Sequence, residues 1–246
     1  MRWMSTHTST LNEAAAAGRD LPERLNIADR FLDARIREGR GNRAALLTDA
    51  GTLTYRDVQA LAERWATLLA EAGVCCEQRV LIALPDGPDF VGVLFGTLKL
   101  GAVVVMVNPG VPAAEARYFL EYTRARAVVT ISATAAAFAE ASRDVQPAPA
   151  MLVADDPELA ARLAAAPTGL KTFDTHRDDA AIWLFSGGTT GRPKAVVQTH
   201  GAFANTTALY GHGVIGYGET DVTLSVPKLY FGYATGSNLF FPFSAG

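Results

Sequence analysis

The chain has 246 residues, of which 49% are hydrophobic and 19% charged, and its formal net charge is −3. This length allows one large domain or two small ones with a sizeable core, and the composition is typical of globular proteins. The small negative charge gives no reason to expect nucleic acid or an anionic membrane as a partner. No apolar run reaches the roughly 18 residues that a membrane-spanning helix needs, so we expect no membrane insertion.

The N-terminal sequence, MRWMSTHTSTLNEAAAAGRD, lacks the apolar core of a signal peptide. We expect residues 1–20 to be a mobile leader outside the fold. Cys75 and Cys76 are neighbours in the sequence and cannot build a disulfide framework. We therefore expect both to be reduced thiols in a cytoplasmic protein.

The next segments predict alternating helices and strands. Two amphipathic helices are predicted at 26–39 and 54–73. Apolar runs then predict strands at 79–84, 102–107, 127–131 and 151–154. The segments between these strands predict helices, the first of them with Asp86 as its N-cap. This order predicts an α/β fold with mostly parallel strands whose sheet is covered by helices.

A glycine-rich loop follows a polar segment at 166–179, which is predicted to be a linker with an exposed His176. The loop sequence is SGGTTGRPK, and the residues after its lysine favour a strand. We therefore predict that the loop joins two strands. A Walker A loop requires a helix after the lysine, and the kinase and Rossmann loops require G-x-G, so none of the three fits.

The residue types in this loop nevertheless predict a polyphosphate site. Glycines let backbone N–H groups approach an anion, hydroxyls donate hydrogen bonds, and a lysine adds positive charge. The residues concerned are Ser186, Gly187, Gly188, Thr189, Thr190, Gly191 and Lys194, with Pro193 stiffening the loop. The alternative is a glycine-rich hairpin without a ligand.

The same loop resembles the signature of the adenylate-forming enzymes, and every position from Ser186 to Lys194 fits. One departure follows, since Ala195 stands where that family most often has glycine. The sequences LTYRDVQALAERWATLLAEAGV, RVLIALPDGPDFVGVLFGTLKLGAVVVMVNP and EARYFLEYTRARAVV resemble the family's other N-terminal blocks in order and spacing. The resemblance covers about 26–246 and implies the fold of the family's large N-terminal domain.

Within this family, the sequence KLYFGYATG is most similar to benzoate-CoA ligases and related aryl-CoA ligases. The resemblance implies that Phe231 forms an aromatic gate near the carboxylate of the substrate. It also implies that Gly232, Tyr233 and Ala234 line the pocket for the ring. The alternative is that these are ordinary core residues. His200 stands where the family often has histidine, and we expect a structural role for it.

The implied activity is the ATP-dependent conversion of a benzoate-type acid to an acyl-adenylate, followed by transfer to coenzyme A. ATP, Mg²⁺ and coenzyme A are the expected cofactors. The loop residues named above would bind ATP, with Lys194 and Thr190 as catalytic residues, and no metal ligand is assigned. The expected partners are a small aromatic carboxylic acid and coenzyme A or a carrier protein, without nucleic acid or membrane, and a homodimer is left open.

Much of the family's machinery follows the point that matches Gly246, and the aromatic C-terminal segment ends without a polar tail. We therefore expect 21–246 to be an incomplete N-terminal domain, without the small C-terminal domain and inactive alone. Two alternatives remain open. One is a truncated, non-catalytic nucleotide-binding or interaction module, and the other is an aryl-acid adenylation domain that loads a carrier protein.

Overall fold

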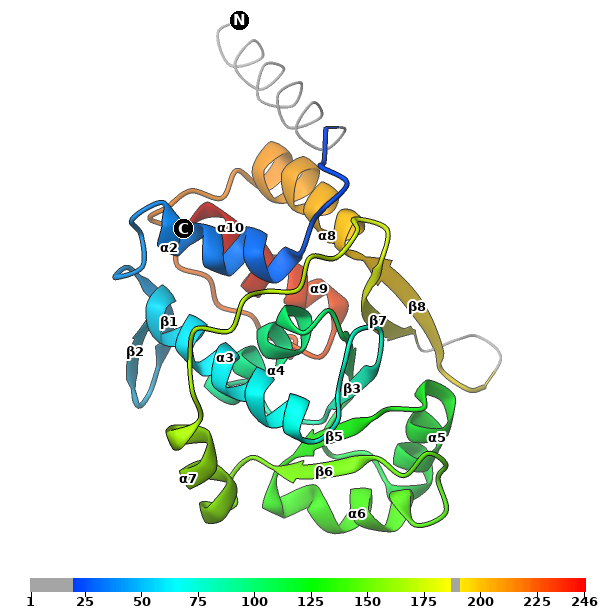
Figure 1. Cartoon of the computed structure of the whole chain (residues 1–246). Coiled ribbons are helices and arrows are strands. Elements are labelled where there is room, and N and C mark those ends of the chain that lie inside the picture. The colour runs from blue at the N-terminus through cyan, green and yellow to red at the C-terminus, as the bar shows by residue number, and fades with distance from the viewer. Residues whose placement is uncertain (1–19, 187–190) are drawn as a thin grey trace, which may run out of the picture.

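The computed structural model describes residues 20–186 and 191–246. In this part of the chain, Figure 1 shows a central sheet with helices on both faces and a small hairpin of β1 and β2 beside it. The strands are β1 Ala44–Thr48, β2 Gly51–Thr54, β3 Arg79–Ile82, β4 Val103–Met106, β5 Ala127–Thr130, β6 Ala150–Val153, β7 Ala180–Ser186 and β8 Lys194–Thr199. The predicted leader lies outside the described residues, apart from Asp20.

The helices alternate with these strands, and η1, η2 and η3 are π-helical segments. Their bounds are η1 Asp29–Asp33, α2 Ala34–Arg37, α3 Tyr55–Glu71, α4 Pro88–Lys99, α5 Ala113–Thr123, α6 Ser132–Ser142, α7 Pro157–Ala165, α8 His200–Thr206, η2 Thr207–Ile215, α9 Gly232–Thr235, η3 Gly236–Phe240 and α10 Phe241–Ala245. None of the described helices is long and apolar enough to cross a membrane.

The central sheet has the strand order β6-β5-β3-β4-β7-β8. All neighbouring strands are parallel except β7 and β8, which are antiparallel. The strands predicted from the apolar runs agree with β3 to β6 within two residues at each end. The predicted fold class is therefore confirmed.

Successive residues of the buried strands point to opposite faces of the sheet, as the pleat requires. Val80 of β3 packs into a core with α3 and α4, whereas the next residue, Leu81, packs with α5 and α6. Both faces are covered, which explains why the strands are continuously apolar rather than alternating. The helix pairs thus cover both faces of the sheet, and the ends of its strands remain for a functional site.

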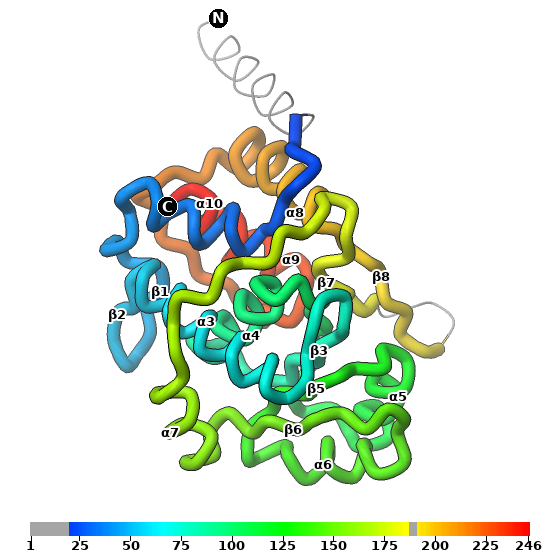
Figure 2. Tube along the Cα trace, in the orientation of Figure 1, coloured from blue at the N-terminus to red at the C-terminus, as the bar shows by residue number. Residues whose placement is uncertain are grey.

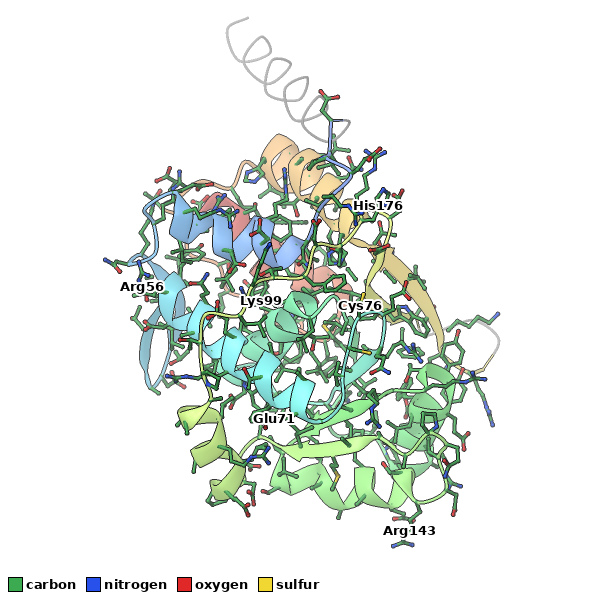
Figure 3. All side chains as sticks on the ribbon, viewed as in Figure 1. Arg56, Glu71, Cys76, Lys99, Arg143 and His176 are labelled. Atoms are coloured by element: carbon green, nitrogen blue, oxygen red, sulfur yellow. The ribbon has the colours of Figure 1, made fainter. Side chains whose placement is uncertain are left out.

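The predicted linker at 166–179 is an extended segment that is bound to the core. Figure 2 shows it running from α7 across the molecule towards β7. The backbone N–H of Phe173 donates to the carbonyl of Lys99 at 2.8 Å. The ammonium of Lys99, labelled in Figure 3, donates to Asp33 at 2.6 Å and to the Thr172 hydroxyl at 3.1 Å, and lies 3.5 Å from Glu63. This buried ion cluster fastens the segment to α3, α4 and η1.

Two local predictions were wrong. Gly87, not Asp86, is the N-cap residue of α4, because the Asp86 carboxylate accepts a hydrogen bond from a distant backbone N–H instead. His176 is half-buried rather than exposed, since its backbone pairs with Arg24 and its Nδ1 accepts from Asp178. The helix predicted at 26–39 is confirmed as a continuous helix over 27–37, of which η1 is a π-helical part. The β1–β2 hairpin and α7 were not predicted.

Candidate functional site

The glycine-rich loop closes a hairpin between β7 and β8, as the sequence predicts. The last pair of the ladder is Ser186 and Lys194. The Ser186 hydroxyl lies 3.4 Å from the Lys194 carbonyl oxygen, a long contact. Gly191 has a φ of 110°, a left-handed backbone conformation that favours glycine. The predicted ligand-binding residues Gly187, Gly188, Thr189 and Thr190 lie outside the described residues.

This hairpin begins at the carboxyl edge of the parallel sheet. β7 runs parallel to β4 with Leu184 opposite Met106, so Ser186 extends just past the carboxyl end of β4. Asp86 and Asn108 follow β3 and β4 at the same edge. The strand order also reverses here, because β4 lies on one side of β3 and the next strand, β5, on the other. Open α/β sheets bind ligands at such reversal points, outside the carboxyl ends of the strands.

The side chains of Ser186 and Lys194 are exposed at this edge. The Lys194 side chain carries a positive charge of the kind that binds anionic ligands. A lysine beside a hydroxyl and a glycine-rich turn is a donor set that fits a polyphosphate.

The loop ends at Arg192 and Pro193, which we call the exit of the hairpin, and both residues contact α5. The Tyr118 hydroxyl donates a hydrogen bond of 2.7 Å to the carbonyl of Pro193, and the Arg192 guanidinium lies 5.3 Å from the centroid of the Tyr118 ring. Sequence reasoning missed Tyr118 because its acceptor is a backbone carbonyl from another element. Such a contact leaves no side-chain pattern in the sequence.

The predicted acyl segment lies beside β7. Phe231 is the N-cap residue of α9, and Gly232 packs on Leu184 so closely that a Cβ would lie 2.6 Å from Leu184 Cδ1. Ala234 is fully buried, whereas the Phe231 and Tyr233 residues are 54% and 68% exposed. The structure therefore brings Gly232 next to the glycine-rich hairpin, but the described residues alone do not enclose the two rings.

Asp86 attaches this segment to the sheet. Its Oδ1 accepts from the backbone N–H of Leu229 at 2.8 Å, and its Oδ2 lies 3.7 Å from the Lys228 ammonium. The buried Thr235 hydroxyl donates to the Leu229 carbonyl at 2.6 Å and lies 3.8 Å from the Met106 sulfur. The segment before α9 is thus held at the carboxyl ends of β3 and β4.

His200 begins α8 directly after β8 and is completely buried. Its Nδ1 accepts a hydrogen bond of 3.1 Å from the Ile27 backbone N–H. Burial lowers the pKa of His200 to about 4, so the ring is neutral at pH 7. The expectation of a structural role is confirmed.

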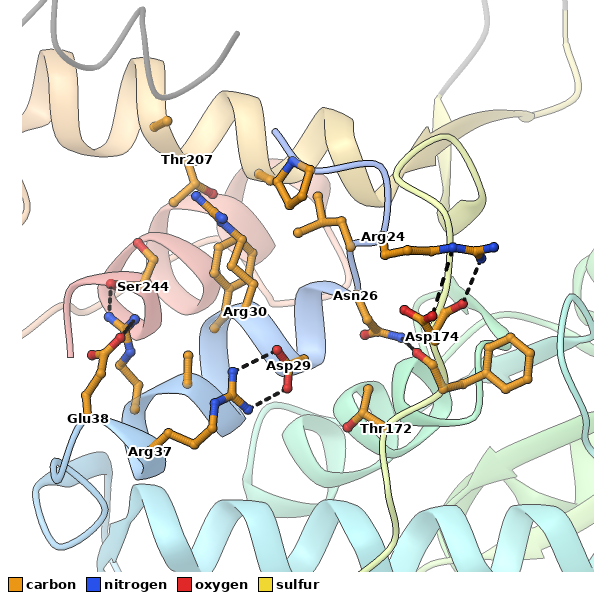
Figure 4. Close-up of a pocket in the computed structure, with 18 of the residues that line it drawn as sticks. Arg24, Asn26, Asp29, Arg30, Arg37, Glu38, Thr172, Asp174, Thr207 and Ser244 are labelled. Carbon is orange, nitrogen blue, oxygen red and sulfur yellow. Dashed lines mark hydrogen bonds and ion pairs between the residues drawn. The ribbon is translucent and has the colours of Figure 1, made fainter. Parts of the chain in front are cut away.

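Two cavities lie away from the hairpin. One of about 650 Å³ separates the β1–β2 hairpin from 218–225 and reaches Asp86. The other, of about 740 Å³, lies between η1, the segment at 171–174 and α8. Figure 4 shows ion pairs in the second cavity, including Arg37 with Asp29 at 2.6 Å. None of the predicted site residues lines it. Among the described residues, no group of three or more His, Cys, Asp or Glu side chains is placed to hold a metal ion.

The family described as AMP-binding enzyme matches residues 32–246. Benzoate–CoA ligase of Thauera aromatica is 32% identical over 92% of this chain and 44% of its own length. A benzoate CoA ligase structure from Burkholderia xenovorans has a TM-score of 0.81 and 31% identity over 90% of this chain and 44% of that one. An anthranilate CoA ligase in complex with anthranoyl-AMP has a TM-score of 0.88 and 29% identity over 93% of this chain and 45% of that one.

The chain spans less than half the length of these relatives. Its mostly parallel sheet, covered by helices, is the fold of the N-terminal domain of adenylate-forming enzymes. Because the family match extends from η1 through the sheet and the glycine-rich hairpin to α10, this chain belongs to the AMP-binding enzymes.

Proposed function

We propose that this chain is the N-terminal part of an aryl-acid–CoA ligase, which activates a benzoate-type acid with ATP and transfers the acyl group to coenzyme A. The position of the glycine-rich hairpin carries the proposal. Ser186 and Lys194 lie at the carboxyl edge of the sheet, and Gly232 packs on Leu184 of the same hairpin. The names of the Thauera and Burkholderia relatives support an aromatic acid and coenzyme A as substrates.

In the first half-reaction, a carboxylate oxygen attacks the α-phosphorus of ATP. The bond from that phosphorus to the bridging oxygen breaks, and pyrophosphate leaves. Both reactants are anions, so positive charge and hydrogen-bond donors at the phosphates lower the barrier. We assign this role to the residues of the loop, with Lys194 and Thr190 as the catalytic pair: Ser186, Gly187, Gly188, Thr189, Thr190, Gly191 and Lys194. Magnesium would neutralise phosphate charge when bound, and we assign it no ligand in this chain.

In the second half-reaction, the thiol of coenzyme A attacks the acyl carbonyl carbon and AMP leaves.

We assign the binding of the aryl ring to Phe231, Gly232, Tyr233 and Ala234. The two aromatic residues are 54% and 68% exposed, so a flat apolar ring can stack on them and remove apolar surface from water.

We also propose a cytoplasmic location. The supporting observation is that Cys75 and Cys76 are free thiols, and Cys75 is exposed. Exposed thiols persist in reducing compartments.

The protein isolated from its native source should form acyl-CoA from ATP, coenzyme A and benzoate, a hydroxybenzoate or anthranilate. Octanoate is the matched control, because it has a carboxylate and comparable apolar surface but no ring. Mass spectrometry of the thioester reads out the reaction. Adenylate without thioester would point to a carrier-protein thiol as acceptor, and no adenylate from any aryl acid would contradict the proposal.

A further inference from the structure

The Tyr118 hydroxyl of α5 donates a hydrogen bond to the Pro193 carbonyl. Through this contact α5 holds the exit of the glycine-rich hairpin. The hydrogen bond is 2.7 Å long and joins residues that lie 75 positions apart in the chain. Lys194 directly follows Pro193. We propose that Tyr118 is a positioning residue, which fixes the Pro193 carbonyl and so holds Lys194 where the phosphates of ATP bind. The inference rests on the function proposed above.

Few other restraints hold this exit in the described part of the chain. The β7–β8 ladder ends at the pair Ser186 and Lys194, so Pro193 lies beyond its last rung. Proline has no N–H and cannot extend the ladder as a donor. The contact between the Ser186 hydroxyl and the Lys194 carbonyl is 3.4 Å long, near the limit for a hydrogen bond. The ladder therefore restrains Lys194 through its pair with Ser186, and the Tyr118 hydroxyl restrains the peptide group that directly precedes Lys194.

The aromatic ring of Tyr118 makes a second contact with the same exit. The Arg192 guanidinium lies 5.3 Å from the ring centroid, within the range of a cation–π interaction. One side chain thus contacts two consecutive residues of the loop, through its ring and through its hydroxyl. The hydroxyl thus holds the peptide group between Pro193 and Lys194, while the ring contacts the Arg192 side chain.

Tyr118 is itself held firmly. Its ring centroid lies 5.8 Å from that of Phe119 and 5.6 Å from that of Tyr122. It packs against the core between the sheet and the helices α5 and α6. A lysine acts on phosphate as a point charge on a flexible stem, so the placement of its backbone decides how often the ammonium meets the ligand. A fixed Tyr118 supplies that placement before ATP binds.

The substitution Tyr118→Phe tests this role, because it keeps the ring and removes the hydroxyl. The matched control is Tyr122→Phe, on the same helix, since the Tyr122 hydroxyl has no hydrogen-bond partner among the described residues. In the native-length protein, Tyr118→Phe should raise the KM for ATP by about three- to tenfold, the ratio that loss of one hydrogen bond produces. The KM for the aryl acid should stay unchanged, which a general structural defect would not allow.

A second measurement does not depend on catalysis. Amide hydrogen exchange of a peptide covering 193–199, without ligand, should be faster in Tyr118→Phe and unchanged in Tyr122→Phe. If the wild-type protein is active and the two variants match in both ATP KM and exchange, the inference is wrong and the proposed function stands. If the wild-type protein activates no aryl acid, the proposed function is wrong, and the exchange rates alone decide whether Tyr118 holds the hairpin exit.

Discussion

Gly232 lies against Leu184 so closely that a Cβ on Gly232 would be 2.6 Å from Leu184 Cδ1. The first residue of α9 therefore packs on the strand that leads into the glycine-rich hairpin. This contact sets the distance between the proposed acyl segment and the proposed ATP loop. A Cβ at position 232 would therefore force the Leu184 side chain or α9 to move.

Gly232→Ala should push α9 away from β7. Insertion of a methyl group into a close contact costs about 1–3 kcal/mol of unfolding free energy, which urea unfolding measures. The variant should also raise the KM for the aryl acid more than the KM for ATP. Gly218→Ala is the control, because its Cβ would meet only Asp221 Oδ2 at an ordinary 3.8 Å. Equal stability of the two variants would contradict the packing role of Gly232.

Asp86→Ala should loosen the acyl segment, because it leaves the Leu229 N–H without its acceptor. The expected loss is about 1–3 kcal/mol of unfolding free energy, the cost of an unpaired buried donor. Asp86→Asn is the matched control, since it keeps the Oδ1 acceptor and loses only the charge that faces Lys228 at 3.7 Å. That ammonium is largely exposed, so the ion pair contributes little. If Asn were as damaging as Ala, the charge rather than the hydrogen bond would hold the segment.

Lys99→Met should be strongly destabilising. It leaves the buried carboxylates of Asp33 and Glu63 without their cation, and breaking a buried pair in this way costs about 3–5 kcal/mol. Arg162→Met is the control, because its pair with Glu71 is about half exposed and is worth at most about 1 kcal/mol. Urea unfolding at neutral pH compares the two. A loss for Lys99→Met no larger than for Arg162→Met would show that the cluster does not fasten the segment at 166–179.

His200 predicts a pH dependence of stability. Burial lowers its pKa from 6.5 to about 4, so between these pH values the unfolded chain binds a proton that the folded protein does not. Stability due to the neutral ring is therefore complete above pH 6.5 and is lost as the pH falls towards 4, by at most about 3 kcal/mol. Protonation of Nδ1 would also remove the acceptor of the Ile27 N–H.

The measurement is the change in unfolding free energy between pH 7 and pH 5 for wild type and His200→Gln. The variant should show a smaller change than wild type. His212→Gln serves as the comparison, because burial also lowers the pKa of His212. If His200→Gln kept the full wild-type change, another group would be responsible.

The sheet could be predicted from the sequence because its strands are buried on both faces. Continuous apolar runs such as 79–84 and 127–131 are typical of parallel strands, and the helices between them repeat at a regular distance. The β7–β8 hairpin was predictable for a local reason, since the residues after Lys194 favour a strand. The β1–β2 hairpin was missed because its strands are only partly buried and give no clear alternation.

The contacts that place the candidate site could not be predicted. Asp86 has the sequence context of a helix N-cap, yet its carboxylate binds the Leu229 N–H, 143 positions away. Tyr118 stands on an amphipathic helix and binds a carbonyl that no pattern marks. Both contacts arise only when the carboxyl ends of separate strands meet at one edge of the sheet, so they depend on the tertiary fold. The motif residues predicted the chemistry, but the contacts that hold them in place could be found only in the structure.

ATP–pyrophosphate exchange by the native-length protein in the presence of benzoate tests the proposed ATP site most directly. The wild-type protein should exchange only when an aryl acid is present. Lys194→Ala should slow that exchange roughly 10²-fold, as loss of one charge-stabilising donor does, and Lys171→Ala, an exposed lysine on the segment at 171–174, should not. Exchange at the wild-type rate in Lys194→Ala, or no aryl-acid-dependent exchange in wild type, would contradict the account.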